Sequence, residues 1–172
     1  IAQCGKPDVF FTEFVSCDGL CSRGRDRLLH HLSYTEDQRP IVAQIWGTNP
    51  ETYYKTAQLL AERGFDGIDI NMGCPVKNVC KTGGGSALIE HPSLARELID
   101  AARQGGSGLP VSVKTRIGYT SIDLLRWVED LLEAEPAAIT LHMRTRSEMS
   151  KVPAHWELMP EAVKAAAGSR TL

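Results

Sequence analysis

The residues best suited to chemistry lie in one short stretch, Gly67-Ile68-Asp69-Ile70-Asn71-Met72-Gly73-Cys74-Pro75. Its first half predicts a buried strand, because isoleucines alternate with Asp69 and glycines bound the run. Gly73 and Pro75 end that strand and impose a turn, with Cys74 between them. A cysteine can also pack as a small hydrophobic residue. A thiol in a polar turn at the carboxyl end of a strand favours a reactive role instead.

Polar side chains also interrupt four successive predicted strands at or near their carboxyl ends. They are Gln44, Asn71, Lys114 and His142. Any one of them alone could be an ordinary solvated or ion-paired side chain. In a barrel of parallel strands, however, these ends face one mouth, which is where active sites lie. None of the four is acidic, so such a mouth would suit an anionic ligand rich in hydrogen-bonding groups.

The elements that position these residues alternate along the chain. We expect strands at 9–15, 41–47, 67–71, 111–117 and 138–142, with another starting near 170. Helical patterns, or room for a helix, separate these strands, and we expect helices at 49–64, 92–106 and 160–167. A further helix would be capped by Thr120 or Ser121, with Ile122, Leu125, Val128 and Leu131 on one side. This alternation predicts a parallel sheet with right-handed crossovers, either doubly wound or a (β/α) barrel. No GxGxxG follows a strand, which disfavours a dinucleotide-binding fold.

A glycine-rich segment follows the cysteine turn. Three consecutive glycines at 83–85 predict that 76–86 lacks regular structure. The segment could be a flexible connector, or a lid or anion-binding nest beside Cys74.

Composition limits the classes of protein that fit. The 172 residues are 42% hydrophobic and 23% charged, as expected for one globular domain. A net charge of −2 argues against a generally basic nucleic-acid-binding surface, although not against a local basic patch. Five irregularly spaced cysteines without a paired CxxC predict neither a zinc site nor a disulfide framework. No signal peptide or membrane-spanning run is visible, so we expect a cytoplasmic protein with reduced thiols.

Four motifs occur in an order that resembles the tRNA-dihydrouridine synthases. They are Asn71-Met72-Gly73-Cys74-Pro75-Val76-x-x-Val79, Gly83-x-Gly85-Ser86-Ala87-Leu88, Val113-Lys114-x-Arg116 and His142-x-Arg144-Thr145. The resemblance implies an FMN-dependent (β/α)8 TIM barrel followed by a small helical domain. It also implies reduction of the C5–C6 double bond of particular tRNA uridines, with NADPH as the reductant and a monomeric full-length protein. Residues 1–172 would then be about strands 2–6 of that barrel, without the helical tRNA-binding domain, and we expect the chain to be a fragment.

The resemblance also assigns roles in catalysis and cofactor binding. Gln44, Lys114 and His142 match positions that hold FMN, and Cys74 matches the catalytic cysteine. In this chemistry a hydride passes from the flavin to C6 of uracil, and Cys74 gives a proton to C5.

Three further residues are expected on the substrate side. Asn71 matches a position that contacts the uracil edge, and we expect Arg116 and Arg144 to meet phosphate or the flavin. The segment 148–156 departs from the family, which commonly has a Gly-aromatic-x-Gly run and then Ala-Asp-Trp there.

Two alternatives stay open at this point. One is another FMN barrel oxidoreductase that acts on a free pyrimidine, such as a dihydroorotate or dihydropyrimidine dehydrogenase, which has a similar Asn-x-x-Cys-Pro turn. The other is a non-catalytic RNA-binding relative, although Cys74 and Lys114 are both present.

Overall fold

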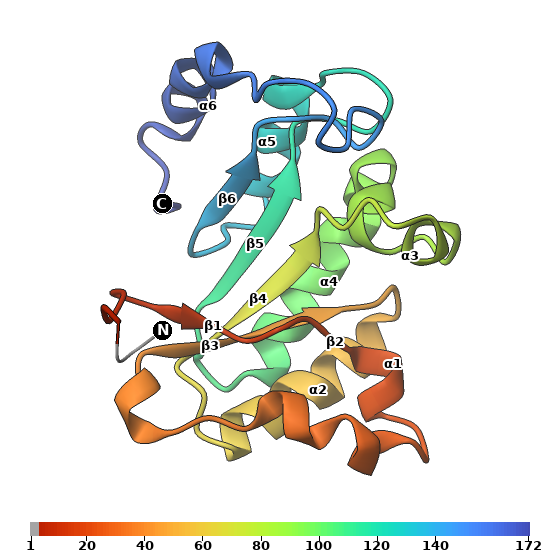
Figure 1. Cartoon of the computed structure of the whole chain (residues 1–172), viewed down its shortest axis with the longest axis vertical. Coiled ribbons are helices and arrows are strands. Elements are labelled where there is room, and N and C mark those ends of the chain that lie inside the picture. The colour runs from red at the N-terminus through yellow and green to blue at the C-terminus, as the bar shows by residue number, and fades with distance from the viewer. Residues whose placement is uncertain (1–3) are drawn as a thin grey trace.

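A single parallel sheet forms the framework of the computed structural model, which describes residues 4–172 (Figure 1). Its strands run in the order β1-β3-β4-β5-β6, and β2 also pairs with β3. Every pairing is parallel. The strands are β1 (Phe10–Phe11), β2 (Val15–Ser16), β3 (Ile41–Trp46), β4 (Gly67–Met72), β5 (Val111–Arg116) and β6 (Ile139–His142).

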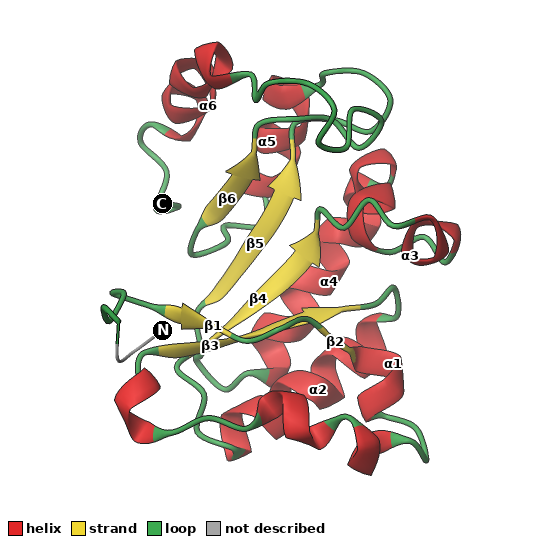
Figure 2. Ribbon diagram, in the orientation of Figure 1, coloured by secondary structure: helices red, strands yellow, loops and turns green. Residues whose placement is uncertain are grey.

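Helices connect the strands and cover one side of the sheet (Figure 2). The α-helices are α1 (Cys17–Leu20), α2 (Pro50–Glu62), α3 (Lys77–Lys81), α4 (Pro92–Gly105), α5 (Leu124–Leu132) and α6 (Met159–Ala166). Short 3₁₀ helices lie at Arg25–Arg27, Leu29–Leu32, Glu36–Gln38, Gly85–Glu90 (η4) and Trp156–Leu158. Among the described residues, no helix has both the length and the apolar character needed to cross a membrane.

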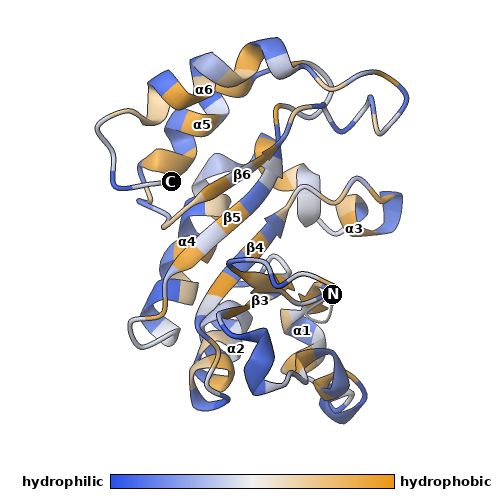
Figure 3. Cartoon of the chain, turned by 60° about the vertical axis from the view of Figure 1, so that its left-hand side comes forward, coloured by the Kyte–Doolittle hydropathy of each residue, from blue (hydrophilic) through white to orange (hydrophobic). Residues whose placement is uncertain are grey.

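The two faces of the sheet differ in chemistry because alternate residues of a strand point to opposite faces. Residues such as Ile45, Ile70 and Val113 are fully buried in one core with the apolar sides of α2 and α4. The intervening residues of β4 and β5 are polar, and Figure 3 shows these hydrophilic stretches between hydrophobic ones. The parallel α/β arrangement expected from the sequence is therefore confirmed, in the form of a half-barrel with one polar face.

The helix predicted at 49–64 forms with the expected signals. Asn49 caps α2, since its side chain accepts the N–H of Glu51 at 2.9 Å. The predicted stripe of Tyr53, Ala57 and Leu60 is fully buried.

The strand expected at 9–15 is wrong as one element, because it divides into β1 and β2. The backbone N–H of Thr12 still donates to Val42 O at 3.0 Å. The N–H of Gln44 then donates to the side-chain Oγ1 of Thr12, also at 3.0 Å, where a regular ladder would use a backbone carbonyl. The side chain thus replaces the backbone and interrupts the strand.

The helix expected to start at Thr120 or Ser121 begins later, at Leu124, with Asp123 at its N-cap position. Consequently Ile122 and Leu125, which were expected on the apolar side, are 45% and 43% exposed. Val128 and Leu131 are buried as expected, together with Leu124 and Trp127. The Trp127 indole N–H donates to Thr115 Oγ1 at 3.0 Å, which fixes the helix face that meets β5.

The strand expected near 170 is not assigned, but the backbone at Leu172 already pairs beside β6. Its N–H donates to Ala137 O at 3.1 Å, and its carbonyl accepts the N–H of Ile139 at 2.8 Å. The preceding helix, α6, ends one residue earlier than expected.

Candidate active site

The polar residues predicted to share one mouth lie on the uncovered face of the sheet, toward its carboxyl edge. The register of β4 and β5 sets Asn71 beside Lys114, and that of β5 and β6 sets Arg116 beside His142. Partners in a parallel register point to the same face. The sheet therefore brings side chains from three separate strands into one row.

A hydrogen-bonded chain of buried side chains links that row across three strands. Gln44 on β3 donates from Nε2 to Asp69 Oδ2 at 2.7 Å, and Ser112 on β5 donates from Oγ to Asp69 Oδ1 at 2.6 Å. Burial raises the pKa of Asp69, while the hydrogen bonds from Ser112 and Gln44 and the charge of Lys114 act in the opposite direction. The side-chain amide of Asn71 extends the chain by donating to Gln44 Oε1 at 2.9 Å.

The turn after β4 is fixed by Asn71. Its Oδ1 accepts the backbone N–H of Gly73 at 3.2 Å and that of Cys74 at 2.9 Å. An asparagine that bonds its own downstream backbone is a common way to set a turn. Cys74 is half-buried at this position, at the end of β4.

The carbonyl of Cys74 is held as firmly as its N–H. Ser86 donates to Cys74 O from both its backbone N and its Oγ, each at 3.0 Å. A Cβ on Gly85, whose φ is +58°, would lie 2.7 Å from the same oxygen. The glycine therefore permits a close approach that no other residue type could make.

The segment 76–86 is consequently not the irregular loop that the triple glycine predicted. It contains α3 and the first turn of η4, and Gly84, Gly85 and Ser86 are buried. The error has a physical cause, since Gly85 serves close packing against Cys74 rather than freedom of the backbone.

A second thiol lies beside the first. Cys80 on α3 is half-buried, with its Sγ 3.3 Å from Ser86 Oγ and 3.6 Å from Cys74 O. Because Cys80 also contacts the backbone of the cysteine turn, proximity alone does not show which of the two thiols is the reactive one. An experiment must distinguish them.

His142 at the end of β6 is kept neutral by its surroundings. Burial lowers its pKa below the ordinary 6.5, and the charges of Arg116, Lys114 and Arg144 lower it further. Arg144 Nη1 lies 2.9 Å from His142 Nε2, and a guanidinium can only donate. Nε2 must therefore be the acceptor, which places the proton of the neutral ring on Nδ1.

The two arginines expected on the substrate side differ in their surroundings. Arg116 is only 5% exposed, and its Nε donates to Gly73 O at 2.8 Å. Its Nη1 donates to the carbonyls of Thr145 and Met149, each at 3.1 Å. Most of its donors are thus used to tie the cysteine turn to the loop after β6. Arg144 is half-buried and, besides His142, binds Val152 O at 2.7 Å.

That loop has its own polar support in the segment that departs from the family pattern. Glu148 accepts the N–H of Thr145 at 2.7 Å, and its other oxygen lies 2.8 Å from His155 Nε2. The backbone bond from Thr145 and the bond with His155 lower the pKa of Glu148. The bond with Glu148 raises the pKa of His155.

A comparison of the chain with known protein families decides its membership. Residues 1–166 match the family model described as "Dihydrouridine synthase (Dus)". The chain belongs to the dihydrouridine synthase family.

Named relatives of this family are similar over nearly the whole chain. The chain is 53% identical over 166 residues to "Probable tRNA-dihydrouridine synthase 2" of Bacillus subtilis (strain 168), which covers 95% of this chain and 50% of that protein. It is 49% identical, with the same coverage, to "Probable tRNA-dihydrouridine synthase" of Staphylococcus aureus (strain COL) and of Staphylococcus epidermidis (strain ATCC 12228 / FDA PCI 1200). The chain thus spans about half the length of the curated relatives that it matches.

Sequence reasoning missed Asp69 as part of this dihydrouridine synthase site. Asp69 was interpreted only as the polar residue that alternates with the isoleucines of a buried strand. The four candidate residues at the strand ends included no acid. A lone carboxylate inside a buried strand was the available signal, because such a group needs hydrogen-bond donors around it. The structure supplies them from Gln44 and Ser112.

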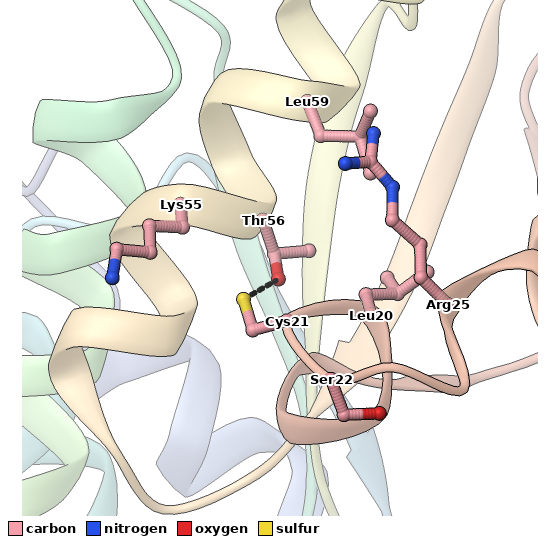
Figure 4. A pocket seen from close by; sticks show the side chains of 7 residues that line it. All are labelled: Leu20, Cys21, Ser22, Arg25, Lys55, Thr56 and Leu59. Carbon is pink, nitrogen blue, oxygen red and sulfur yellow. Dashed lines mark hydrogen bonds between the residues drawn. The ribbon is translucent and has the colours of Figure 1, made fainter.

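The helical layer of this dihydrouridine synthase chain contains a separate pocket, shown in Figure 4. It has a volume of about 380 Å³ and lies between α1 and α2. Cys21 Sγ is 3.9 Å from Thr56 Oγ1 there, while Lys55 is already ion-paired with Glu51 at 2.6 Å. The pocket shares no residue with the polar row. In the part of the chain that the structure describes, no cluster of three or more His, Cys, Asp or Glu residues is arranged to hold a metal ion.

Proposed function

We propose that the full-length protein that contains this chain reduces particular uridines of tRNA to 5,6-dihydrouridine, with FMN as cofactor and NADPH as reductant. One observation carries the proposal: the Cys74 turn is fixed at its N–H by Asn71 and at its C=O by Ser86, beside a polar face of three parallel strands. Such a fixed thiol at the carboxyl edge of a half-barrel has the position of a catalytic group.

The donor set on the uncovered face fits FMN. Lys114 carries a positive charge and forms no ion pair with a residue in the described range 4–172. Gln44 has one amide N–H left after its bond to Asp69, and neutral His142 carries a proton on Nδ1. Flavin carbonyl oxygens and a phosphate need such donors. When bound there, FMN supplies the hydride that uracil C6 receives.

Cys74 holds the proton for C5 in this proposal. Because both of its peptide groups are hydrogen-bonded, its Sγ extends from a backbone position that these bonds hold in place. A general acid is effective when its geometry is fixed in this way. Arg116 supports the same geometry from the other side of the turn through its bond to Gly73 O.

The substrate must present its base outside the stacked helix, because a buried site cannot reach a base within a stack. We assign Asn71 to the uracil edge. Arg144 is more exposed than Arg116, so we assign Arg144 to phosphate or flavin. Exposed lysines on α3, Lys77 and Lys81, together with Arg146 and Lys151 in the loop after β6, would meet the tRNA backbone. The protein would act in the cytoplasm as a monomer, with its helical domain outside residues 1–172.

The test uses full-length protein, FMN, NADPH and tRNA that lacks dihydrouridine. We expect the purified protein to be yellow, to oxidise NADPH, and to form dihydrouridine that mass spectrometry of digested tRNA detects. The double variant Lys114→Ala/His142→Ala should hold less FMN at equal protein concentration. A colourless protein that FMN cannot reconstitute would contradict the cofactor assignment, and formation of dihydro-product from free pyrimidines but not from tRNA would contradict the substrate.

A further inference from the structure

Asp69 is the one acidic group of the polar chain, and the proposed function gives it no task. It lies in the middle of β4 and is 1% exposed. A buried carboxylate is costly unless hydrogen-bond donors surround it. Its two oxygens take one donor from each neighbouring strand, Ser112 on β5 and Gln44 on β3.

The carboxylate gives the chain of amides a direction. An acceptor at position 69 requires Gln44 to point Nε2 toward it, so Oε1 of Gln44 faces Asn71. Oε1 in turn requires Asn71 to point Nδ2 toward it, which leaves Oδ1 for the turn. At the far end the N–H groups of Gly73 and Cys74 can only donate, so both ends favour the same direction.

This direction limits what Asn71 can offer a ligand. Its Oδ1 already accepts two N–H groups, and one of its two Nδ2 hydrogens is bound to Gln44. The remaining capacity is a single N–H, so Asn71 can meet a ligand as a donor. A donor at this point can bond to a carbonyl oxygen of a pyrimidine but not to an exocyclic amino group, because that amino group is also a donor.

We propose that Asp69 is a positioning residue: its carboxylate fixes the orientation of the Gln44–Asn71 amide pair, so that Asn71 faces the pyrimidine as a hydrogen-bond donor and the Cys74 turn stays in place. The inference rests on the proposed function. This positioning role differs from one in which Asp69 only supplies a negative charge opposite Lys114. The charge role needs a carboxylate, whereas the directional role needs an acceptor that reaches Gln44.

Two substitutions in full-length protein separate these roles. Asp69→Leu keeps the number and branching of the side-chain heavy atoms and removes the acceptor. Asp69→Asn removes the charge, but Ser112 Oγ can accept from its amide N–H and so turn its oxygen toward Gln44. Thr56→Val is the matched control, since Thr56 is buried on α2, away from the polar chain, with its Oγ1 3.9 Å from Cys21 Sγ.

We measure kcat/KM for tRNA, the Kd for FMN, and amide hydrogen exchange of Gly73 and Cys74 in FMN-free protein. Asp69→Leu should lower kcat/KM by about 10- to 100-fold, the scale for losing a hydrogen bond to a charged group, and should speed exchange at both amides. Asp69→Asn should recover most of this loss, and Thr56→Val should change the exchange of Gly73 and Cys74 by less than about 3-fold. Should Asp69→Leu fail to fold, Asp69→Ser, whose hydroxyl is too short to reach Gln44, takes its place with the same expectation.

Either of two results overturns the proposal. Asp69→Asn as impaired as Asp69→Leu would show that the charge carries the effect, and wild-type behaviour of Asp69→Leu would show that no positioning is needed. Failure of the wild-type protein to bind FMN or modify tRNA would instead contradict the proposed function, while the exchange of Gly73 and Cys74 would still test the positioning role in FMN-free protein.

Discussion

The Oδ1 atom of Asn71 accepts the backbone N–H of Cys74 at 2.9 Å, so the amide that ends β4 also fixes the turn that carries the thiol. Replacing Asn71 with Ala should remove this acceptor and also the donor to Gln44 Oε1. We expect the free energy of unfolding to fall by about 2–4 kcal/mol, because buried polar groups lose their partners. Urea denaturation measures the change.

Asn71→Asp is the matched control for that substitution. A carboxylate can still accept the N–H groups of Gly73 and Cys74, but it cannot donate to Gln44. Hydrogen exchange at Cys74 should therefore stay slow in Asn71→Asp and become fast in Asn71→Ala. Equal exchange rates in both variants would show that the turn does not depend on Asn71.

Gly85 permits the contact between η4 and the cysteine turn. Gly85→Ala should lower the free energy of unfolding by about 2–4 kcal/mol, because the added Cβ would lie 2.7 Å from Cys74 O and 2.9 Å from Val79 Cγ1, at a φ of +58°. Gly84→Ala is the control, since its Cβ would come no closer than 3.4 Å to a neighbour and its φ is −91°. Thermal unfolding of both variants checks this, and a Gly85→Ala variant as stable as Gly84→Ala would refute the packing argument.

The exposed lysines of α3 should contribute to tRNA affinity through phosphate contacts. The double variant Lys77→Glu/Lys81→Glu should weaken tRNA binding and reduce the salt dependence of the Kd, because fewer counterions are released. Lys55→Glu/Arg63→Glu reverses two exposed charges in the helical layer, one on α2 and one directly after it, and should change the Kd far less. Binding titrations at several salt concentrations compare the two, and equal effects would mean that the α3 charges act only through net charge.

The loop after β6 should be most stable in mildly acidic solution. The bond with Glu148 raises the pKa of His155, so its contribution is complete below the ordinary pKa of 6.5 and is lost as pH rises through the higher folded-state pKa. Bonds from Thr145 and His155 lower the pKa of Glu148, so its contribution is complete above the ordinary pKa of 4.5 and is lost as pH falls through the lower folded-state pKa. The protection of the amides of residues 145–155, measured as the exchange rate relative to the intrinsic rate at each pH, should therefore be greatest between pH 4.5 and 6.5.

His155→Gln supplies the control for this pH dependence. A neutral amide can donate to Glu148 at any pH, so the loss of protection above pH 6.5 should disappear while the loss at acidic pH remains. An unchanged alkaline limb would assign the effect to another group.

The sequence allowed the order of strands and the polar row to be predicted because both follow from local patterns. Alternation in β4 and the polar residues at strand ends are visible without knowledge of tertiary contacts. The helix start at Leu124 and the break at Thr12 were not predictable in the same way. Both depend on hydrogen bonds between residues far apart in the chain, from Trp127 to Thr115 and from Gln44 to Thr12.

The candidate site shows the same division. Cys74, Asn71 and Lys114 could be named from residue type and spacing, whereas the triple glycine was misinterpreted as a flexible segment. Gly85 is close-packed against Cys74 O, and nothing in a run of glycines distinguishes close packing from flexibility. Asp69 was missed because its partners come from two other strands.

The most direct test of the account compares Cys74→Ala with Cys80→Ala in full-length protein, by the dihydrouridine content of tRNA after incubation with FMN and NADPH. Cys74→Ala should lower product formation by about 10²-fold or more, the scale for removing a general acid, while FMN binding and NADPH oxidation stay largely intact. Cys80→Ala should have little effect. Normal product from Cys74→Ala, or a loss confined to Cys80→Ala, would contradict the assignment of the proton donor.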